Sequence, residues 1–168
     1  MLPKMIDPRR IADQDSEYQT SMQASLLPRL TEAVDAIDEE IAVDLRFFRN
    51  EQGRVCVKGE ASTRVDMRCQ RCLKASDQLL LASIDLIIVF SDDQAKSLPK
   101  ELDAWVVDGT ADLHGLIEDE LLLAMPIVAY HSGTDCSIPD EYIAREQDKT
   151  IGRQSPFEKL KDLTGKTD

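Results

Sequence analysis

Apolar and polar residues alternate over three long stretches of the chain, and a period of two predicts β-strands with one buried face. The first stretch covers residues 41–48, the second residues 55–68 and the third residues 80–90. The second and third are joined by a short connection that contains two cysteines. They therefore predict a long β-hairpin with a cysteine pair in its turn.

Helical periodicity is found in two places. Pro28 stands at a first-turn position and is followed by apolar residues at helical spacing, so residues 28–34 predict a short helix. A longer helix is predicted from Asp112, whose carboxylate can cap its first turn, to Met125, because Pro126 cannot continue it. Of its three consecutive acidic residues, 118 and 119 are expected on the solvated side, with 120 nearer the boundary.

These elements predict an α+β fold. An antiparallel sheet that contains the long hairpin is expected to pack against one main helix, with a short N-terminal helix and extended or disordered termini. Residues 1–136 are expected to form a single domain, in which the polar, weakly patterned first 23 residues lie as an extended arm. Residues 137–168 are expected to be a mostly disordered polar tail.

One short helix is expected within that tail, near residues 155–163. Ser155 at the N-cap, Pro156 at the first helical position and Glu158 two residues later form a capping box. A short amphipathic helix in a disordered tail is a common docking element. Its apolar face gives three candidate partner-docking residues, which are Phe157, Leu160 and Leu163.

The charge of the chain is acidic on average but unevenly distributed. The 168 residues have a net charge of -12, which argues against indiscriminate binding to phosphate backbones. Residues 46–74 nevertheless hold eight basic and three acidic residues, a local charge of +5, which leaves -17 for the remainder. Because arginine can clamp a phosphate through two hydrogen bonds, this side of the hairpin is a candidate RNA contact. The candidate residues are Arg54, Lys58, Arg64, Arg68, Arg71 and Lys74. The alternative is an ordinary solvated face.

The four candidate metal ligands come from two separate segments. Cys69 and Cys72 have the C-x-x-C spacing that allows two thiolates to bind one ion from a tight turn. His131 and Cys136 follow the main helix and complete a Cys3His set, which suits structural zinc. The fold must bring the two pairs together, because 58 residues separate them. The alternative is a tight turn with free cysteines and an unrelated histidine.

Other classes of function have weaker support. A thiol redox protein needs its C-x-x-C at the start of a helix, whereas predicted strands flank the pair here. A redox function is therefore the least supported alternative. The motifs of hydrolases, P-loop enzymes and dinucleotide-binding enzymes are missing from the sequence, so we expect no enzyme, no catalytic residue and no small-molecule substrate. A signal-peptide core and a membrane-length apolar run are also missing. The expectation is a cytoplasmic protein that makes no membrane contact.

Four segments together resemble a known family. They are the C-x-R-C-L turn at residues 69–73, the acidic helix that ends at Pro126, the ligand-type residues His131 and Cys136, and the S-P-F-E-K-L motif at 155–160. In this order, over roughly residues 43–163, the chain resembles the YceD-like family, the large ribosomal RNA subunit accumulation proteins of bacteria and plastids. The resemblance implies ribosome biogenesis, through synthesis, processing or stability of 23S rRNA, without a known enzymatic activity.

The resemblance also bears on the metal and on partners. Other members carry cysteines after the proline-terminated helix, and His131 stands where one of them would fall, which keeps a zinc ligand type. This chain lacks the further C-x-x-C that some relatives place beyond that point. Two modes of action stay open. The basic hairpin contacts large-subunit rRNA, or the acidic body acts as an adaptor or escort for a basic ribosomal protein or assembly factor.

Overall fold

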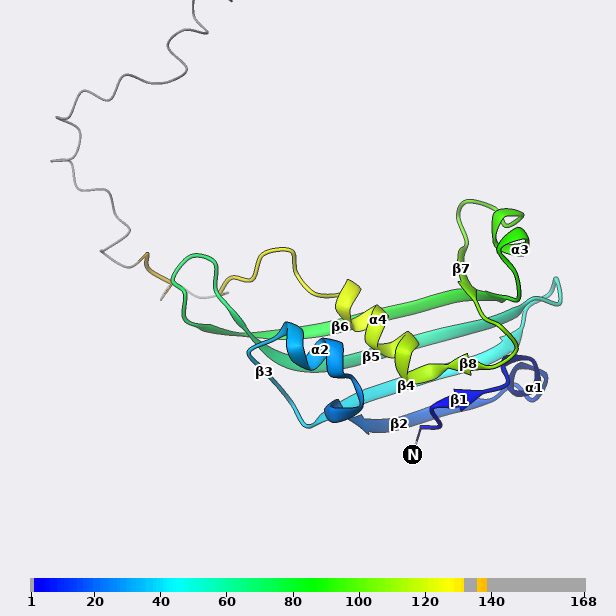
Figure 1. Cartoon of the computed structure of the whole chain (residues 1–168), viewed down its shortest axis with the longest axis horizontal. Coiled ribbons are helices and arrows are strands. Elements are labelled where there is room, and N and C mark those ends of the chain that lie inside the picture. The colour runs from blue at the N-terminus through cyan, green and yellow to red at the C-terminus, as the bar shows by residue number, and fades with distance from the viewer. Residues whose placement is uncertain (1, 132–135, 139–168) are drawn as a thin grey trace, which may run out of the picture. The chain divides into compact units, whose positions relative to one another are not determined.

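A mostly antiparallel sheet of six strands is the largest structural unit of the described chain (Figure 1). The computed structural model describes residues 2–131 and 136–138. All strand pairs in this sheet are antiparallel except the pair β6–β7. The strand order is β2 (Glu17–Gln23), β4 (Glu40–Arg49), β5 (Val55–Arg68), β6 (Ala75–Val89) and β7 (Asp103–Val106), and β3 (Ala36–Ile37) also pairs with β5.

The long hairpin predicted from the alternation is confirmed as β5 and β6. Its register runs without a break from Val55 opposite Ile88 to Arg68 opposite Ala75. Burial alternates along both strands over most of their length, because one face of the sheet is covered and the other is solvated.

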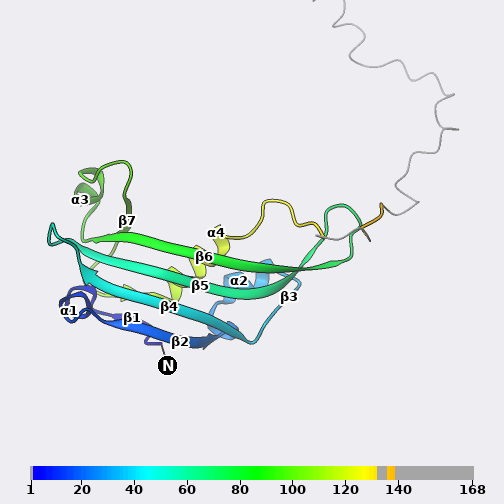
Figure 2. The ribbon, with the colours of Figure 1, turned by 180° about the vertical axis from the view of Figure 1, so that it is seen from behind.

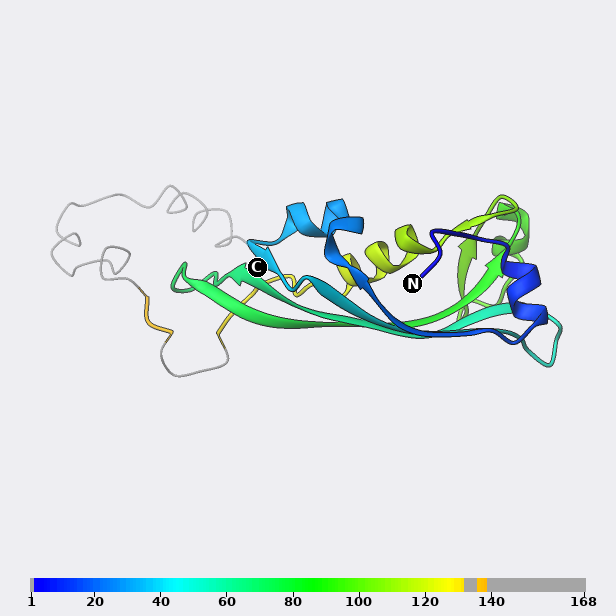
Figure 3. The same ribbon diagram turned by 90° about the horizontal axis from the view of Figure 1, so that it is seen from below.

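Helices cover one face of the sheet over most of its length (Figures 2 and 3). At one end of the opposite face, Ala95 and Leu98 pack against the buried side chains of Cys56, Ile87 and Val89. The elements on the covered face are α2 (Pro28–Ala33), α4 (Leu113–Leu123) and a small pair of strands, β1 (Met5–Ile6) and β8 (Ala111–Asp112). The short elements α1 (Pro8–Asp13), η1 (Ala24–Leu26) and α3 (Asp92–Lys96) connect the strands. The apolar core lies between the sheet and the helices, and its largest fully buried side chains include Leu27, Leu30, Phe47, Ile84, Leu113, Ile117 and Leu121.

The α+β class, the short helix at 28–33 and the main helix capped by Asp112 are confirmed. The expectation of an extended N-terminal arm was wrong, because residues 5–23 form β1, α1 and β2, and β2 pairs with β4. Of the side chains of β2, only that of Met22 is fully buried. The ring of Tyr18 packs edge-on against that of Phe47, with 5.9 Å between the ring centres. Most side chains of this edge strand are polar and exposed or half-buried, so its sequence gives only a weak apolar pattern.

The chain divides into two compact units, Met1–Cys136 and Ser137–Asp168. Of the second unit only residues 137 and 138 are described. The predicted tail helix, with Phe157, Leu160 and Leu163, therefore lies outside the described residues and stays a prediction. No helix in residues 2–131 and 136–138 has the length and apolar character that crossing a bilayer requires.

Gly59 allows the backbones of β4 and β5 to approach closely in the middle of the sheet. It lies opposite Leu45 and has a φ of +151°, a conformation that favours glycine. A β-carbon at this position would lie 1.9 Å from the carbonyl oxygen of Asp44. The position therefore requires a residue without a side chain.

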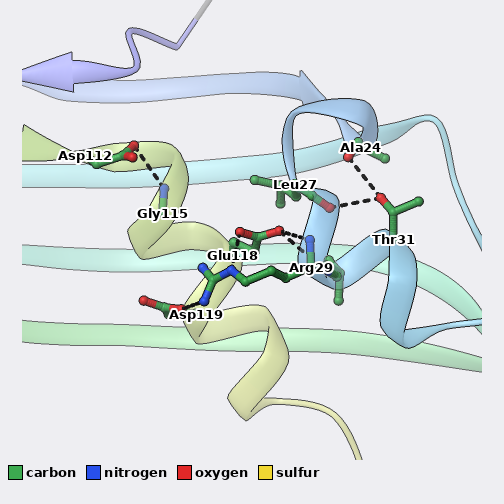
Figure 4. Close-up of polar contacts among 9 residues, drawn as sticks. Ala24, Leu27, Arg29, Thr31, Asp112, Gly115, Glu118 and Asp119 are labelled. Atoms are coloured by element: carbon green, nitrogen blue, oxygen red, sulfur yellow. Dashed lines mark hydrogen bonds and ion pairs between the residues drawn. The ribbon is translucent and has the colours of Figure 1, made fainter.

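Glu118 is buried between α4 and α2 (Figure 4), so the expectation that it is solvated was wrong. Its Oε1 accepts the backbone N–H of Arg29 at 2.6 Å and that of Leu30 at 3.2 Å, and its Oε2 accepts Nε–H of Arg29 at 2.8 Å. Both backbone groups belong to the first turn of α2, whose N-cap residue, Leu27, has no side-chain acceptor. Glu118 therefore caps α2 from a different helix.

Replacing Glu118 with alanine is expected to lower the free energy of unfolding by about 2–3 kcal/mol, because two backbone donors lose their acceptor. Urea unfolding followed by circular dichroism measures this change. Asp119→Ala is the matched control, since Asp119 is exposed and pairs with the same Arg29 at 2.7 Å. We expect this exposed pair to contribute less than about 1 kcal/mol. Equal, small losses in both variants would contradict the capping role.

Candidate metal centre

The connection between β5 and β6 folds into a tight turn that carries Cys69 and Cys72. The backbone N–H of Cys69 donates to the carbonyl of Lys74, and the N–H of Leu73 donates to the carbonyl of Cys69, both at 2.9 Å. Leu73 has a φ of +62°, a left-handed conformation that costs an L-residue about 1–2 kcal/mol. Both cysteines are buried in this closed turn.

The segment that follows α4 returns to this turn (Figure 1). The backbone N–H of Gln70 donates to the carbonyl of Ala129 at 2.9 Å, and Nε2–H of Gln78 donates to the carbonyl of Tyr130 at 3.0 Å. These hydrogen bonds hold residues 129–130 against the hairpin. The next residue, His131, consequently lies beside the cysteine pair.

The structure brings all four candidate ligands together. Their ligand atoms lie within 4.8 Å of one another. The Sγ atoms of Cys69 and Cys136 are 3.5 Å apart, and Sγ of Cys72 is 3.3 Å from Nδ1 of His131. Tetrahedral bonds of about 2.3 Å to sulfur and about 2.0 Å to nitrogen place ligand atoms roughly 3.5–3.8 Å apart. This cluster therefore has the donors and the spacing to bind a metal ion.

The orientation of the His131 ring also suits a ligand. Its Nε2 is 2.7 Å from the carbonyl oxygen of Ala75. A carbonyl only accepts, so Nε2 carries the proton and Nδ1, which lies beside the Cys72 sulfur, keeps its lone pair. A backbone partner on the second ring nitrogen is typical of metal-binding histidines.

The backbone around the thiols changes their titration. Burial raises the pKa of Cys69, but the N–H groups of Cys72, Arg71 and His131 outweigh this effect and hold that pKa below its ordinary value. Burial also raises the pKa of Cys136, and the adjacent Cys69 and Cys72 raise it further. Without a bound cation, the surroundings thus favour a thiolate at Cys69 and oppose one at Cys136.

The backbone groups that complete this site were not predicted from the sequence. The carbonyls of Ala75, Ala129 and Tyr130 accept the hydrogen bonds that orient His131 and hold its segment in place. Every residue has a carbonyl, so no residue type at these positions could have indicated the role.

The six basic residues predicted to contact RNA do not form one continuous stripe. In the middle of the hairpin, Nζ of Lys58 lies 2.9 Å from the carboxylate of Asp85, and Nη1 of Arg64 lies 2.7 Å from that of Asp77. The hydrogen bond to Asp85 raises the pKa of Lys58. These two cations are therefore paired across the hairpin.

The remaining four basic residues lie at the two ends of the hairpin. Arg54 precedes β5 and lies at the end remote from the cysteines. Arg68, Arg71 and Lys74, here called the tip cations, surround the cysteine pair and are exposed. No carboxylate in residues 2–131 and 136–138 forms an ion pair with them.

Comparisons with known proteins identify a family. A family model described as "Large ribosomal RNA subunit accumulation protein YceD" matches residues 57–164, a range that contains the whole cysteine–histidine cluster and the tip cations. A relative of the same description from Haemophilus influenzae is 32% identical over 173 residues, which cover 98% of this chain and 97% of the relative. No solved structure matches the chain. The chain belongs to the YceD family of large ribosomal RNA subunit accumulation proteins.

Proposed function

We propose that this chain is a cytoplasmic, non-enzymatic ribosome-biogenesis factor that supports the synthesis, processing or stability of 23S rRNA. We propose that it contacts this RNA through the tip cations. The family name supports the role in accumulation of the large-subunit RNA. One observation carries the proposed contact: the tip cations are exposed and lack an ion-pair partner in the described chain, whereas aspartates pair with Lys58 and Arg64. Basic side chains that lack an ion-pair partner and lie on an exposed turn can bind the phosphate oxygens of RNA.

We propose further that Cys69, Cys72, His131 and Cys136 hold a structural zinc ion. Three thiols and an imidazole make a closed set of donors for zinc, which would leave no open position for a substrate. Bound there, zinc would supply rigidity. The four residues would tie the hairpin turn to the segment that follows α4, and the tip cations would keep a fixed arrangement.

Neutralising the tip cations tests the RNA contact. In the triple variant Arg68→Gln, Arg71→Gln, Lys74→Gln, affinity for 23S rRNA fragments is expected to fall about 100-fold. The slope of log affinity against log salt concentration should decrease by about 2–3, because each lost phosphate contact lowers it by nearly one. Fluorescence anisotropy at several salt concentrations measures both quantities.

The double variant Lys58→Gln, Arg64→Gln is the matched control for this experiment. Aspartates already pair with both residues, so we expect little change in affinity or in salt dependence. An unchanged slope in the triple variant, together with normal large-subunit levels in cells that carry it, would reject the contact.

An adaptor for a basic ribosomal protein or assembly factor is the second candidate. Apolar side chains beyond the buried part of α4 favour it, because Leu123 is 78% exposed, Tyr130 is 53% exposed and Ile127 is fully exposed. The triple tip variant separates the two candidates, since an adaptor would keep its protein partners and its effect on rRNA. A thiol redox role has less support, because Cys69 and Cys72 lie between two strands and not at the start of a helix.

A further inference from the structure

A cavity of about 500 Å³ lies at the end of the hairpin remote from the cysteine cluster. It is lined by the β4–β5 turn, the end of β6, the region of α3 and one residue of α1, which Figure 1 shows at the same end of the sheet. About 40 Å of extended strand separates it from Cys69. Its volume lies within the range of small-ligand sites. None of its lining residues belongs to the candidate metal centre or to the tip cations.

Three arginines and no acidic residue line the cavity. Arg49 is already paired, because it contacts the carboxylate of Asp13 and donates to the carbonyl of Gly53 at 3.0 Å. Arg9 and Arg54 form no ion pair with any carboxylate in the described part of the chain. The lining therefore carries two uncompensated guanidinium groups, which suit an anion.

The rest of the lining is suited to a flat, partly apolar group. The guanidinium of Arg9 lies over the ring of Phe90, 3.9 Å from its centre. Aromatic side chains and guanidinium planes are the surfaces on which unpaired nucleobases stack. Beside them, Leu98 adds apolar surface, and Oε1 of Gln94 accepts the N–H of Phe90 at 2.8 Å. The amide nitrogen of Gln94 is consequently left with N–H groups to donate.

We propose that this cavity binds a nucleoside phosphate, either as a free nucleotide or as an unpaired nucleotide of an RNA strand. The phosphate pairs with Arg9 and Arg54, and the base covers the apolar lining near Phe90 and Leu98. Inorganic phosphate would leave that lining in water, and an uncharged ligand would leave both guanidinium groups unpaired. The inference does not depend on the rRNA contact at the tip, because the two sites share no residue.

Titration of the isotope-labelled full-length protein with adenosine monophosphate, followed by NMR, tests the proposal. The amide signals of Gly53 and Phe90 are expected to shift, and that of Ala129, at the metal centre, is expected to stay unchanged. Adenosine and inorganic phosphate should each bind about tenfold more weakly than the monophosphate. A single-stranded oligoadenylate distinguishes the sources. Tighter binding of the oligonucleotide with the same shifts identifies RNA, and tighter binding of the monophosphate identifies a free nucleotide.

Substitutions of the lining arginine Arg54 test whether its side chain binds the nucleotide. Arg54→Ala is expected to weaken binding of adenosine monophosphate about tenfold, and Arg54→Lys should lose less, because it keeps the charge but not the two-point geometry. Arg10→Ala is the matched control, since Arg10 is exposed on α1 and does not line the cavity. Unchanged signals elsewhere verify the fold of each variant. Absence of shifts at millimolar nucleotide, equal binding of inorganic phosphate, or undiminished affinity in Arg54→Ala would overturn the proposal.

Discussion

Replacing Cys69 with serine is expected to abolish zinc binding by the purified protein and to lower its thermal midpoint by about 10 °C. Zinc present at about 1,000 times its dissociation constant stabilises a folded protein by about 4 kcal/mol. For a chain of this size each kcal/mol shifts the midpoint by about 2–4 °C. Chelation of the wild-type protein should produce the same decrease, and added zinc should reverse it only in the wild type.

Zinc per chain, determined by elemental mass spectrometry, and the thermal midpoint are the two measurements. Cys56→Ala is the matched control, because Cys56 is buried against Ile87 and Val89 and is not part of the cluster. This variant should keep one zinc ion per chain even where its stability falls. Retention of one zinc ion by Cys69→Ser, or no uptake by the wild-type protein after zinc loading, would contradict the assignment.

Gly59→Ala is expected to lower the free energy of unfolding by about 3–5 kcal/mol. A β-carbon there would lie 1.9 Å from the carbonyl oxygen of Asp44, so β4 and β5 must separate to accommodate it. Overpacking and an unfavourable φ each cost about 1–3 kcal/mol, and the two costs add at this position. Urea unfolding of the purified variant measures the loss.

Gly53→Ala separates the steric cost at Gly59 from the backbone cost. Gly53 also has a positive φ, +72°, but no atom lies within 4 Å of the position that a β-carbon would take. Only the conformational cost of about 1–2 kcal/mol then applies. Similar losses in the two variants would show that the close approach of β4 and β5 contributes little.

The hairpin and the main helix could be predicted because their sequences repeat a strong pattern. Apolar and polar residues alternate over most of the fourteen residues of β5, and Asp112 and Pro126 mark the two ends of the predicted main helix. The four candidate ligands could also be named, because the C-x-x-C spacing of Cys69 and Cys72 and the nearby pair His131 and Cys136 have the residue types of a zinc site. Their meeting could not be predicted, because it depends on backbone hydrogen bonds to Ala129 and Tyr130.

Other features depend on tertiary context that the pattern does not contain. Glu118 has acidic neighbours on the same helix, yet it stands three residues before the buried Leu121, so helical spacing places it beside the core. The pairing of Lys58 with Asp85 follows once the turn at 69–74 fixes the hairpin register. The cavity at Arg54 could not be inferred, because α1 and α3 approach it only in the folded chain.

The sequence positions of the four clustered residues impose an order on biosynthesis. A nascent chain exposes Cys69 and Cys72 outside the ribosome while the segment that contains His131 and Cys136 is still to be translated. The two hairpin strands can pair first. The cysteine–histidine cluster can form only after α4 and the residues that follow it have left the ribosomal tunnel. A product that terminates before residue 131 would therefore lack two of the four clustered residues even if its hairpin formed. Assembly of the cluster at the hairpin turn thus depends on synthesis of the whole domain.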